Sequence, residues 1–208
     1  MNDQMWAEIK RLKNDAKLLR DIGEADRATA ALDKAIATLD VVPSQPQTPI
    51  ESERIRAELA DCWGMKGGIF RRAGRLADAL AAYKTGLHFE SGNSYNLTNS
   101  IVLELLINCS ELEELKANIA AARDEVRRQV ESYRSSQWWA WADLGLLELL
   151  CGREDQALDA YKHFATTGAR ASDYDSTISV LEELSAKCNQ PLRASLQRAG
   201  SLLKRLKS

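Results

Sequence analysis

The sequence predicts an all-α fold built from helical hairpins. Apolar residues recur at helical spacing along almost the whole chain, and the alternating β-branched runs typical of strands do not occur. Ala, Leu, Glu, Lys and Arg, which favour helices, dominate the sequence. The expected helices also come in pairs that a glycine separates, which indicates a series of antiparallel hairpins.

Ten helices are expected, each placed by its apolar periodicity and by the residues that start or stop it. They cover residues 4–21, 24–39, 49–72, 76–90, 95–108, 110–133, 137–151, 154–167, 173–187 and 191–207. Three of the breaks contain the hairpin glycines Gly23, Gly74 and Gly152. The third and the last helix begin with a proline, which suits the first helical position.

Two helix starts carry a capping box, in which a hydroxyl side chain and a glutamate three residues later each bond a backbone N–H group of the other. Thr48 and Glu51 start the third helix, and Ser110 and Glu113 start the sixth. The segment 41–49 contains three prolines and lacks apolar periodicity, so it is predicted to be a loop.

Length and charge limit the kind of protein. The 208 residues suffice for one large domain or two small ones with a core. A formal net charge of -2 gives no reason to expect nucleic-acid or membrane binding. No run of about 18 apolar residues occurs, so no membrane span is expected. The charged first residues do not resemble a secretory signal, and a cytoplasmic location is predicted.

No residues are arranged for catalysis or metal binding. The chain has no nucleophile motif, no phosphate-binding glycine loop and no HExxH. The cysteines are widely spaced, do not cluster with the two histidines and are expected to be reduced thiols of the core. They are Cys62, Cys109, Cys151 and Cys188. The prediction is a protein without enzyme activity, metal or cofactor.

The paired helices share one residue pattern when they are aligned on their glycine. An alanine follows the glycine by five residues, and a leucine or tyrosine comes four residues later. A small residue stands seven places before the glycine, and a leucine or tryptophan eleven places before it. These sets are Ala28, Ala79 and Ala157; Leu32, Tyr83 and Tyr161; Ala16, Gly67 and Gly145; and Leu12, Trp63 and Trp141. A small residue beside a large one is expected where two helices cross closely.

This pattern resembles the tetratricopeptide repeat, a helix-turn-helix unit of about 34 residues. The resemblance implies a superhelical solenoid of helical hairpins in a single domain, with Trp63 and Trp141 buried at equivalent places. Its parts are a degenerate first repeat at 1–40, a proline-rich insertion at 41–49, a second repeat at 50–90, a diverged third repeat with a long helix at 94–135, a fourth repeat at 137–168 and capping helices at 172–208, in one domain of residues 1–208. The last helix suits a cap, and contact with an anionic surface is the alternative.

Two further glycines in the second repeat raise the question of a binding site. Gly64 and Gly68 share one helix face, turned away from Trp63 and Gly67, and each costs roughly 1 kcal/mol relative to alanine. In the family that the chain resembles, this face lines the concave groove. Either a partner or ligand approaches the backbone there, or the next repeat packs closely at this place.

Basic residues accompany these glycines on the same predicted face. They are Lys10, Lys13, Lys17 and Arg20 in the first repeat and Arg71 and Arg72 in the second. An acidic peptide, a carboxylate terminus or a phosphate would suit them. The alternative is a solvated helix face, partly neutralised by Asp15 and Asp21.

Aromatic residues extend the expected groove, and Tyr95 and Trp139 are assigned to it. Trp138, Trp139 and Trp141 lie on one helix, where adjacent residues point about 100° apart. Trp138 or Trp139 must therefore face away from the core position of Trp141. Such a residue would stack on a ligand or anchor a partner, or it would pack against the preceding long helix.

The region from Ser91 to Leu184 is also similar to a narrower group. The order of Tyr95–Asn99, a long helix and Trp138–Leu144 resembles tetratricopeptide modules related to the TRAF-binding region of stress-activated kinases. Bacterial members of that group occur beside signalling or conflict-system effectors. This resemblance implies a sensor or adaptor that regulates an effector.

The predicted function is a non-enzymatic scaffold or adaptor that binds a protein or peptide partner in the concave groove, and an acidic partner would suit its cations. The alternative is a sensor domain for a small anionic or nucleotide-like ligand. A closed basic pocket around Gly64, Gly68 and Arg71 is expected for the small ligand, and an open trough for a peptide.

Overall fold

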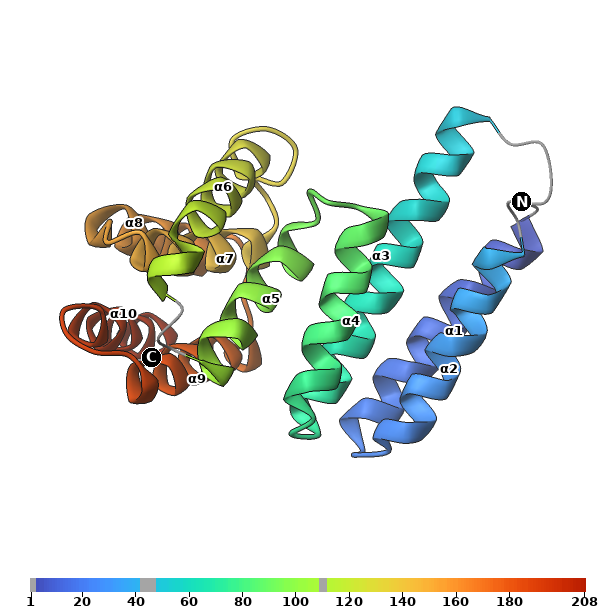
Figure 1. Ribbon diagram of the computed structural model, residues 1–208, viewed down its shortest axis with the longest axis horizontal. Coiled ribbons are helices and arrows are strands. Elements are labelled where there is room, and N and C mark those ends of the chain that lie inside the picture. Colours follow the sequence, from blue (N-terminus) through green and yellow to red (C-terminus); the bar gives the residue numbers. More distant parts are fainter. Residues whose placement is uncertain (1–2, 42–47, 109–111) are drawn as a thin grey trace. The chain divides into compact units, whose positions relative to one another are not determined.

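The computed structural model describes residues 3–41, 48–108 and 112–208, and its regular elements in these ranges are all helices. Figure 1 shows α1 (Asp3–Asp21), α2 (Ala25–Asp40), α3 (Pro49–Arg72), α4 (Leu76–Phe89), α5 (Ser94–Ile107), α6 (Leu112–Val130), α7 (Trp138–Leu150), α8 (Glu154–Thr166), α9 (Ala171–Lys187) and α10 (Leu192–Lys207). The predicted all-α fold of helical hairpins is confirmed. No described helix is both long and apolar enough to cross a membrane.

The start of α3 agrees with its predicted cap. The hydroxyl of Thr48 accepts a hydrogen bond from the backbone N–H of Glu51 at 3.2 Å, and Pro49 is the first helical residue. This bond satisfies one of the N–H groups that a helix start leaves without an internal partner. The second predicted capping box falls partly outside the described residues, because it depends on Ser110.

Most other helix starts lie within one residue of the predicted ones, and those of α9 and α10 show where the cap prediction was wrong. Helix α9 begins at Ala171, two residues early, because the carboxylate of Asp173 accepts a hydrogen bond from the backbone N–H of Arg170 at 2.8 Å. Helix α10 begins at Leu192, and Pro191 stands before the helix, at the N-cap. The side chain that caps α9 is thus an aspartate in the first turn of the helix. A search for a Ser or Thr just before the helix does not find it.

The chain divides into two compact units, Met1–Ser100 and Ile101–Ser208, and α5 begins in the first and ends in the second. In the first unit, α1 packs on α2, α3 on α4, and α2 on α3. In the second unit, α6 packs on α7, α7 on α8, and α9 on α10, which also contacts α8. The pairs α1–α2, α3–α4, α7–α8 and α9–α10 therefore form as the repeat pattern predicts.

Glycines of the repeat pattern occupy two kinds of place. Gly74 and the equivalent glycines of the other two hairpins have φ between 72° and 83°, a left-handed conformation that only glycine adopts readily. Gly67 and Gly145 lie where two helices cross. A β-carbon on Gly67 would lie 2.7 Å from the ring of Tyr83, and one on Gly145 would lie 2.8 Å from the ring of Tyr161. The predicted close crossings are confirmed.

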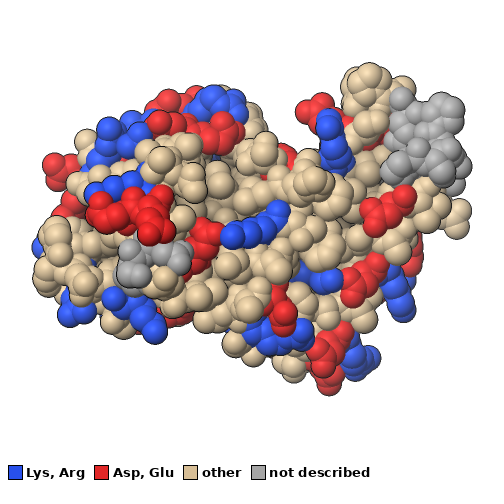
Figure 2. Space-filling model, in the orientation of Figure 1, with Lys and Arg blue, Asp and Glu red and all other residues tan. Residues whose placement is uncertain are grey.

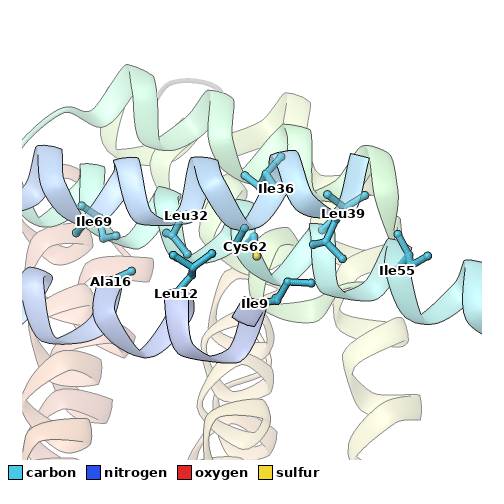
Figure 3. Packing of buried hydrophobic residues seen from close by; sticks show 12 residues of the cluster. Ile9, Leu12, Ala16, Leu32, Ile36, Leu39, Ile55, Cys62 and Ile69 are labelled. Atoms are coloured by element: carbon cyan, nitrogen blue, oxygen red, sulfur yellow. The ribbon is translucent and has the colours of Figure 1, made fainter. Parts of the chain in front are cut away.

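An apolar core fills the first unit between α1, α2 and α3. Figure 3 shows its side chains pointing toward one another; they include Ile9, Leu12, Ala16, Leu32, Ile36, Leu39, Ile55, Cys62 and Ile69. Burial raises the pKa of the Cys62 thiol to about 12, so this thiol stays protonated at neutral pH. Cys62 and Cys151 are free thiols, Cys188 is buried, and Cys109 lies outside the described residues.

The two signature tryptophans are not buried as expected. Trp63 and Trp141 are both half-buried. The ammonium group of Lys66 lies 4.4 Å from the centroid of the Trp63 ring, whereas Trp141 stacks on His163 and donates its Nε1–H to the carbonyl of Ser135 at 2.8 Å. Equivalent places in the repeat therefore hold these rings among different neighbours.

Candidate interaction surface

The packing around Asn96 explains the additional glycine at position 64. Its side-chain amide, on α5, donates a hydrogen bond to the carbonyl of Ala60 at 2.9 Å. A β-carbon on Gly64 would lie 2.5 Å from Oδ1 of Asn96, and one on Gly86 would lie 2.9 Å from its Cγ. Asn96 is thus wedged between α3 and α4. Of the two interpretations of Gly64, the close packing of the next helix is the one that fits.

Gly68 lies one turn further along α3 and is half-buried. A β-carbon on it would lie 3.2 Å from the hydroxyl oxygen of Tyr95. The Tyr95 side chain packs edge-on against Tyr83, with 5.8 Å between ring centroids, yet 39% of its surface is exposed. A partly exposed aromatic side chain therefore lies beside a glycine of α3.

Arg71 follows on the same side of α3. One of its guanidinium nitrogens donates to Oδ1 of Asn99 at 3.4 Å. Asn99 in turn donates its amide N–H to the carbonyl of Tyr95 at 2.9 Å, and so it is held by its own helix. These bonds orient a guanidinium group beside an exposed ring. We call Gly68, Arg71, Tyr95 and Asn99 the Tyr95 surface.

Lys13 is occupied within the first unit. Its ammonium group contacts the carboxylate of Asp61 at 2.5 Å and also that of Glu58, and its side chain is only 16% exposed. Burial alone would lower the pKa of Lys13, but the two carboxylates outweigh burial and raise it. Lys13 therefore links α1 to α3, whereas Lys10 and Lys17 on the same helix are exposed.

Acidic residues also accompany the remaining predicted cations. Arg20 lies 2.8 Å from the carboxylate of Asp21, and Arg72 lies 3.6 Å from the same group. Figure 2 shows basic and acidic side chains interspersed on the face in view, with no large area of a single sign. The predicted basic face is therefore partly neutralised, and among its cations Arg71 is linked through Asn99 to the helix that carries Tyr95.

The tryptophans of α7 belong to the second unit. Trp138 packs edge-on against Phe164 of α8, with 5.9 Å between ring centroids. Trp139 is half-buried, and the guanidinium carbon of Arg134 lies 5.0 Å from the centroid of its ring. The ring that faces away from the hairpin is thus covered by a cation from the connection between α6 and α7.

The last helix is held to α8 by a charge-assisted contact. The carboxylate of Glu154, at the start of α8, accepts hydrogen bonds from the guanidinium of Arg198 and from the hydroxyl of Ser195, the latter at 2.7 Å. These bonds lower the pKa of Glu154 to about 2. Lys204 contacts Glu182 of α9 at 2.8 Å. Cations of α10 therefore pair with carboxylates of its own unit.

Replacing Glu154 with glutamine is expected to remove a pH dependence from the stability of the second unit. The pKa of this carboxyl group is lower in the folded chain than in the unfolded chain. Its stabilising effect is therefore complete at pH values above its ordinary pKa of about 4.5. That effect is lost as the pH falls toward 2. Urea unfolding at pH 7, 4 and 2.5 should show wild type and variant converging as the pH falls. A constant difference across these values would contradict the assignment.

No described group of three or more His, Cys, Asp or Glu residues is arranged to hold a metal ion. A surface recess lies away from the Tyr95 surface, on α1 and α2. It has a volume of about 490 Å³ and is lined by Gln4, Met5, Ala7, Glu8, Arg11 and Thr38. Sequence reasoning missed Asn96 and Asn99, because α5 belongs to the diverged repeat and lacks the signature residues.

No family model matches the chain, and no curated protein matches its sequence. Solved structures do match its fold. A crystal structure of MamA protein is 15% identical, with a TM-score of 0.42, and the match covers 96% of this chain and 92% of that one. A tetratricopeptide repeat protein from Parabacteroides merdae is 17% identical, with a TM-score of 0.41 and coverage of 96% and 76%. The TPR2AB domain of yeast Sti1, in a pHSP90 complex, is 13% identical, with a TM-score of 0.24 and coverage of 97% and 99%.

The chain's own geometry defines a protein of the helical-hairpin repeat class. Its hairpins turn at left-handed glycines, and a small residue meets a large ring at the crossings of α3 with α4 and α7 with α8. The fold is an all-α array of helical hairpins in which the tetratricopeptide-like residue pattern recurs. Because fold alone does not give function, the function is inferred below from the side chains of the Tyr95 surface.

Proposed function

We propose that the protein is a non-enzymatic scaffold whose Tyr95 surface binds a segment of a partner protein. The exposed ring of Tyr95 beside the half-buried turn of Gly68 carries this proposal. Aromatic residues supply much of the binding energy at protein interfaces because they bury a large area with few rotatable bonds. A glycine such as Gly68 lets a partner backbone approach the helix closely.

The chemistry of this surface favours an acidic segment. Arg71 offers a guanidinium group that Asn99 orients, and such a group recognises carboxylates through paired hydrogen bonds. Lys17 is an exposed cation of the same unit. Lys13 adds little to such recognition, because Asp61 and Glu58 already neutralise it. We therefore propose that one carboxylate beside an apolar side chain, rather than a long acidic run, is the recognised feature.

The small-ligand alternative has less support. It needs a closed basic pocket around Gly64, Gly68 and Arg71, but Asn96 and Tyr95 cover Gly64. The partial exposure of the Tyr95 ring also favours a segment that lies across the surface. Regulation of a signalling or defence effector, which the narrower resemblance implies, is retained as a proposal about the identity of the partner, and a cytoplasmic location goes with it.

Replacing Tyr95 with alanine is expected to weaken capture of the partner by at least about tenfold, because an anchor residue of an interface carries about 2 kcal/mol or more. Gly68→Gln should abolish capture, because its side chain would occupy the turn. Both variants should keep the helical circular-dichroism signal. The measurement is quantitative capture from the native host's lysate by the tagged full chain, followed by a binding curve with the identified partner.

Tyr133→Ala is the matched control, since Tyr133 is 60% exposed and belongs to the other unit. A partner held by wild type and Tyr133→Ala but lost by Tyr95→Ala would support the proposal. Binding should also weaken as sodium chloride is raised, because salt screens exposed charges. Equal capture by wild type and Tyr95→Ala would show that the partner binds elsewhere.

A further inference from the structure

A cation, an indole ring and a carboxylate meet on one face of α7. Trp139 and Asp143 are four residues apart on this helix, so they share a face. The guanidinium carbon of Arg134 lies 5.0 Å from the centroid of the Trp139 ring, within the range of a cation–π interaction. Arg134 also donates to Oε1 of Gln129 at 2.7 Å, and its charge acts on Asp143.

Two buried polar atoms, one on α7 and one on α8, lack hydrogen-bond partners among the described residues. They are Oδ2 of Asp143 and the hydroxyl oxygen of Tyr161, whose side chain is fully buried. Each of the two groups acts electrostatically within this cluster, Tyr161 with Asp143 and Asp143 with Arg134. Buried polar groups are paired in the great majority of cases. The carboxylate therefore favours a further donor or cation.

The ionisation of Asp143 indicates the same preference. Burial raises the pKa of this carboxyl group well above its ordinary value, and the charge of Arg134 opposes the rise without cancelling it. A second cation next to Oδ2 would stabilise the ionised form. Arg134 is thus a partial counter-ion, which stacks on the ring but forms no hydrogen bond to Oδ2 of Asp143.

We propose that the Trp139–Asp143 face of α7 binds an arginine side chain of a partner polypeptide, and that Arg134 occupies this place in the unbound chain. A guanidinium group fits because its plane stacks on an indole while its edge donates to a carboxylate. A lysine ammonium would satisfy the charge but not the stacking. Arg134 comes from the connection before α7, not from a helix, so it can leave without unwinding an element.

The test uses the full chain and a defined probe, the peptide Ac-(Gly-Arg)3-Gly-NH2. A matched peptide with citrulline in place of arginine keeps the shape but removes the charge. Binding is followed by the NMR shift of the Trp139 indole N–H, assigned with Trp139→Phe. The arginine peptide should shift this signal, and the citrulline peptide should not. A lysine peptide should bind several-fold more weakly than the arginine peptide.

Two variants give effects of opposite sign. Arg134→Gln should bind the arginine peptide at least about fivefold more tightly than wild type, because it removes the internal competitor. Asp143→Asn should bind at least about tenfold more weakly in either background. A role of Arg134 in structure alone would not increase affinity when it is removed. Asp159→Asn on α8, whose side chain is 69% exposed, should change nothing.

Three results would overturn the proposal: equal binding of the citrulline peptide, no gain of affinity in Arg134→Gln, or unchanged binding in Asp143→Asn. If Arg134→Gln does not fold, as its unfolding midpoint would reveal, Asp143→Asn in the wild-type chain still decides the question. All these residues belong to the second unit. Failure here would therefore leave the Tyr95 surface of the first unit untouched, and the reverse also holds.

Discussion

Replacing Arg127 with alanine is expected to lower the unfolding free energy of the second unit by about 3–5 kcal/mol. Arg127 on α6 contacts Glu148 on α7, whose side chain is 0% exposed. Oε2 of Glu148 already lacks a partner among the described residues. Without Arg127, a buried carboxylate would have lost its counter-charge, and its desolvation would no longer be offset. Urea unfolding, followed through amide exchange in α7, measures the loss.

Arg128→Ala serves as the control, because Arg128 pairs with Glu125 at the surface of the same helix and is 62% exposed. Such a pair contributes about 1 kcal/mol or less. A double replacement, Arg127→Met with Glu148→Leu, should restore most of the lost stability, because it removes both charges together. A loss in Arg127→Ala no larger than in Arg128→Ala would mean that Glu148 is not held by this pair.

The sequence predicts the hairpins better than it predicts the contacts between them. The helices and the glycine turns depend on residues close to one another in the chain. The glycine turns are confirmed, and most helix ends lie within one residue of the predicted ones, whereas the helix expected at 110–133 ends at Val130. The place of Glu148 in the repeat pattern corresponds to Phe70 of the second repeat. Its charge is compatible with that place because Arg127, on the preceding helix, pairs with it, and the charge of Arg123 also acts on it. No rule of spacing within one helix reveals such a partner.

In the candidate site, too, some positions could be predicted from the sequence and their tertiary contacts could not. Gly68, Arg71 and Tyr95 were predicted as one surface, and the structure brings them together because they follow from helical spacing and repeat register. Lys13 was assigned to the same surface, but acidic residues on a neighbouring helix neutralise it. Whether a cation faces solvent or a carboxylate depends on tertiary pairing. The close packing at Gly64 could likewise not be predicted, because it depends on Asn96, which lies in the diverged repeat.

Gly64→Ala is expected to destabilise the first unit by about 2–4 kcal/mol, although the same change in an open helix gains about 1 kcal/mol. The new β-carbon would lie 2.5 Å from Oδ1 of Asn96 and 3.2 Å from the ring of Tyr95. Asn96 has no room to retreat, because Gly86 limits it on the other side. Overpacking of this kind costs about 1–3 kcal/mol, and loss of the buried bond to Ala60 adds about 1–3 kcal/mol.

Gly200→Ala on α10 is the matched control. Gly200 is also a buried glycine inside a helix, yet a β-carbon there would meet nothing within 4 Å. It should therefore raise stability by up to about 1 kcal/mol, in line with helix propensity and the smaller entropy of the unfolded chain. The two substitutions are chemically identical. Opposite signs of the change in stability, measured by thermal or urea unfolding, would therefore be due to the close approach of α5 at Gly64.

A double-mutant cycle identifies the side chain responsible. If Asn96 is the obstacle, Asn96→Ala should reduce the loss caused by Gly64→Ala by at least about 1 kcal/mol, because residues in direct contact do not behave additively. Asn96→Ala alone should also destabilise, since the carbonyl of Ala60 loses its donor. Strictly additive losses, or a Gly64→Ala chain as stable as wild type, would show that α5 does not press against α3 at this place. In that case the approach of a ligand or partner would again be the explanation of Gly64, and the Tyr95 surface would have to include this residue.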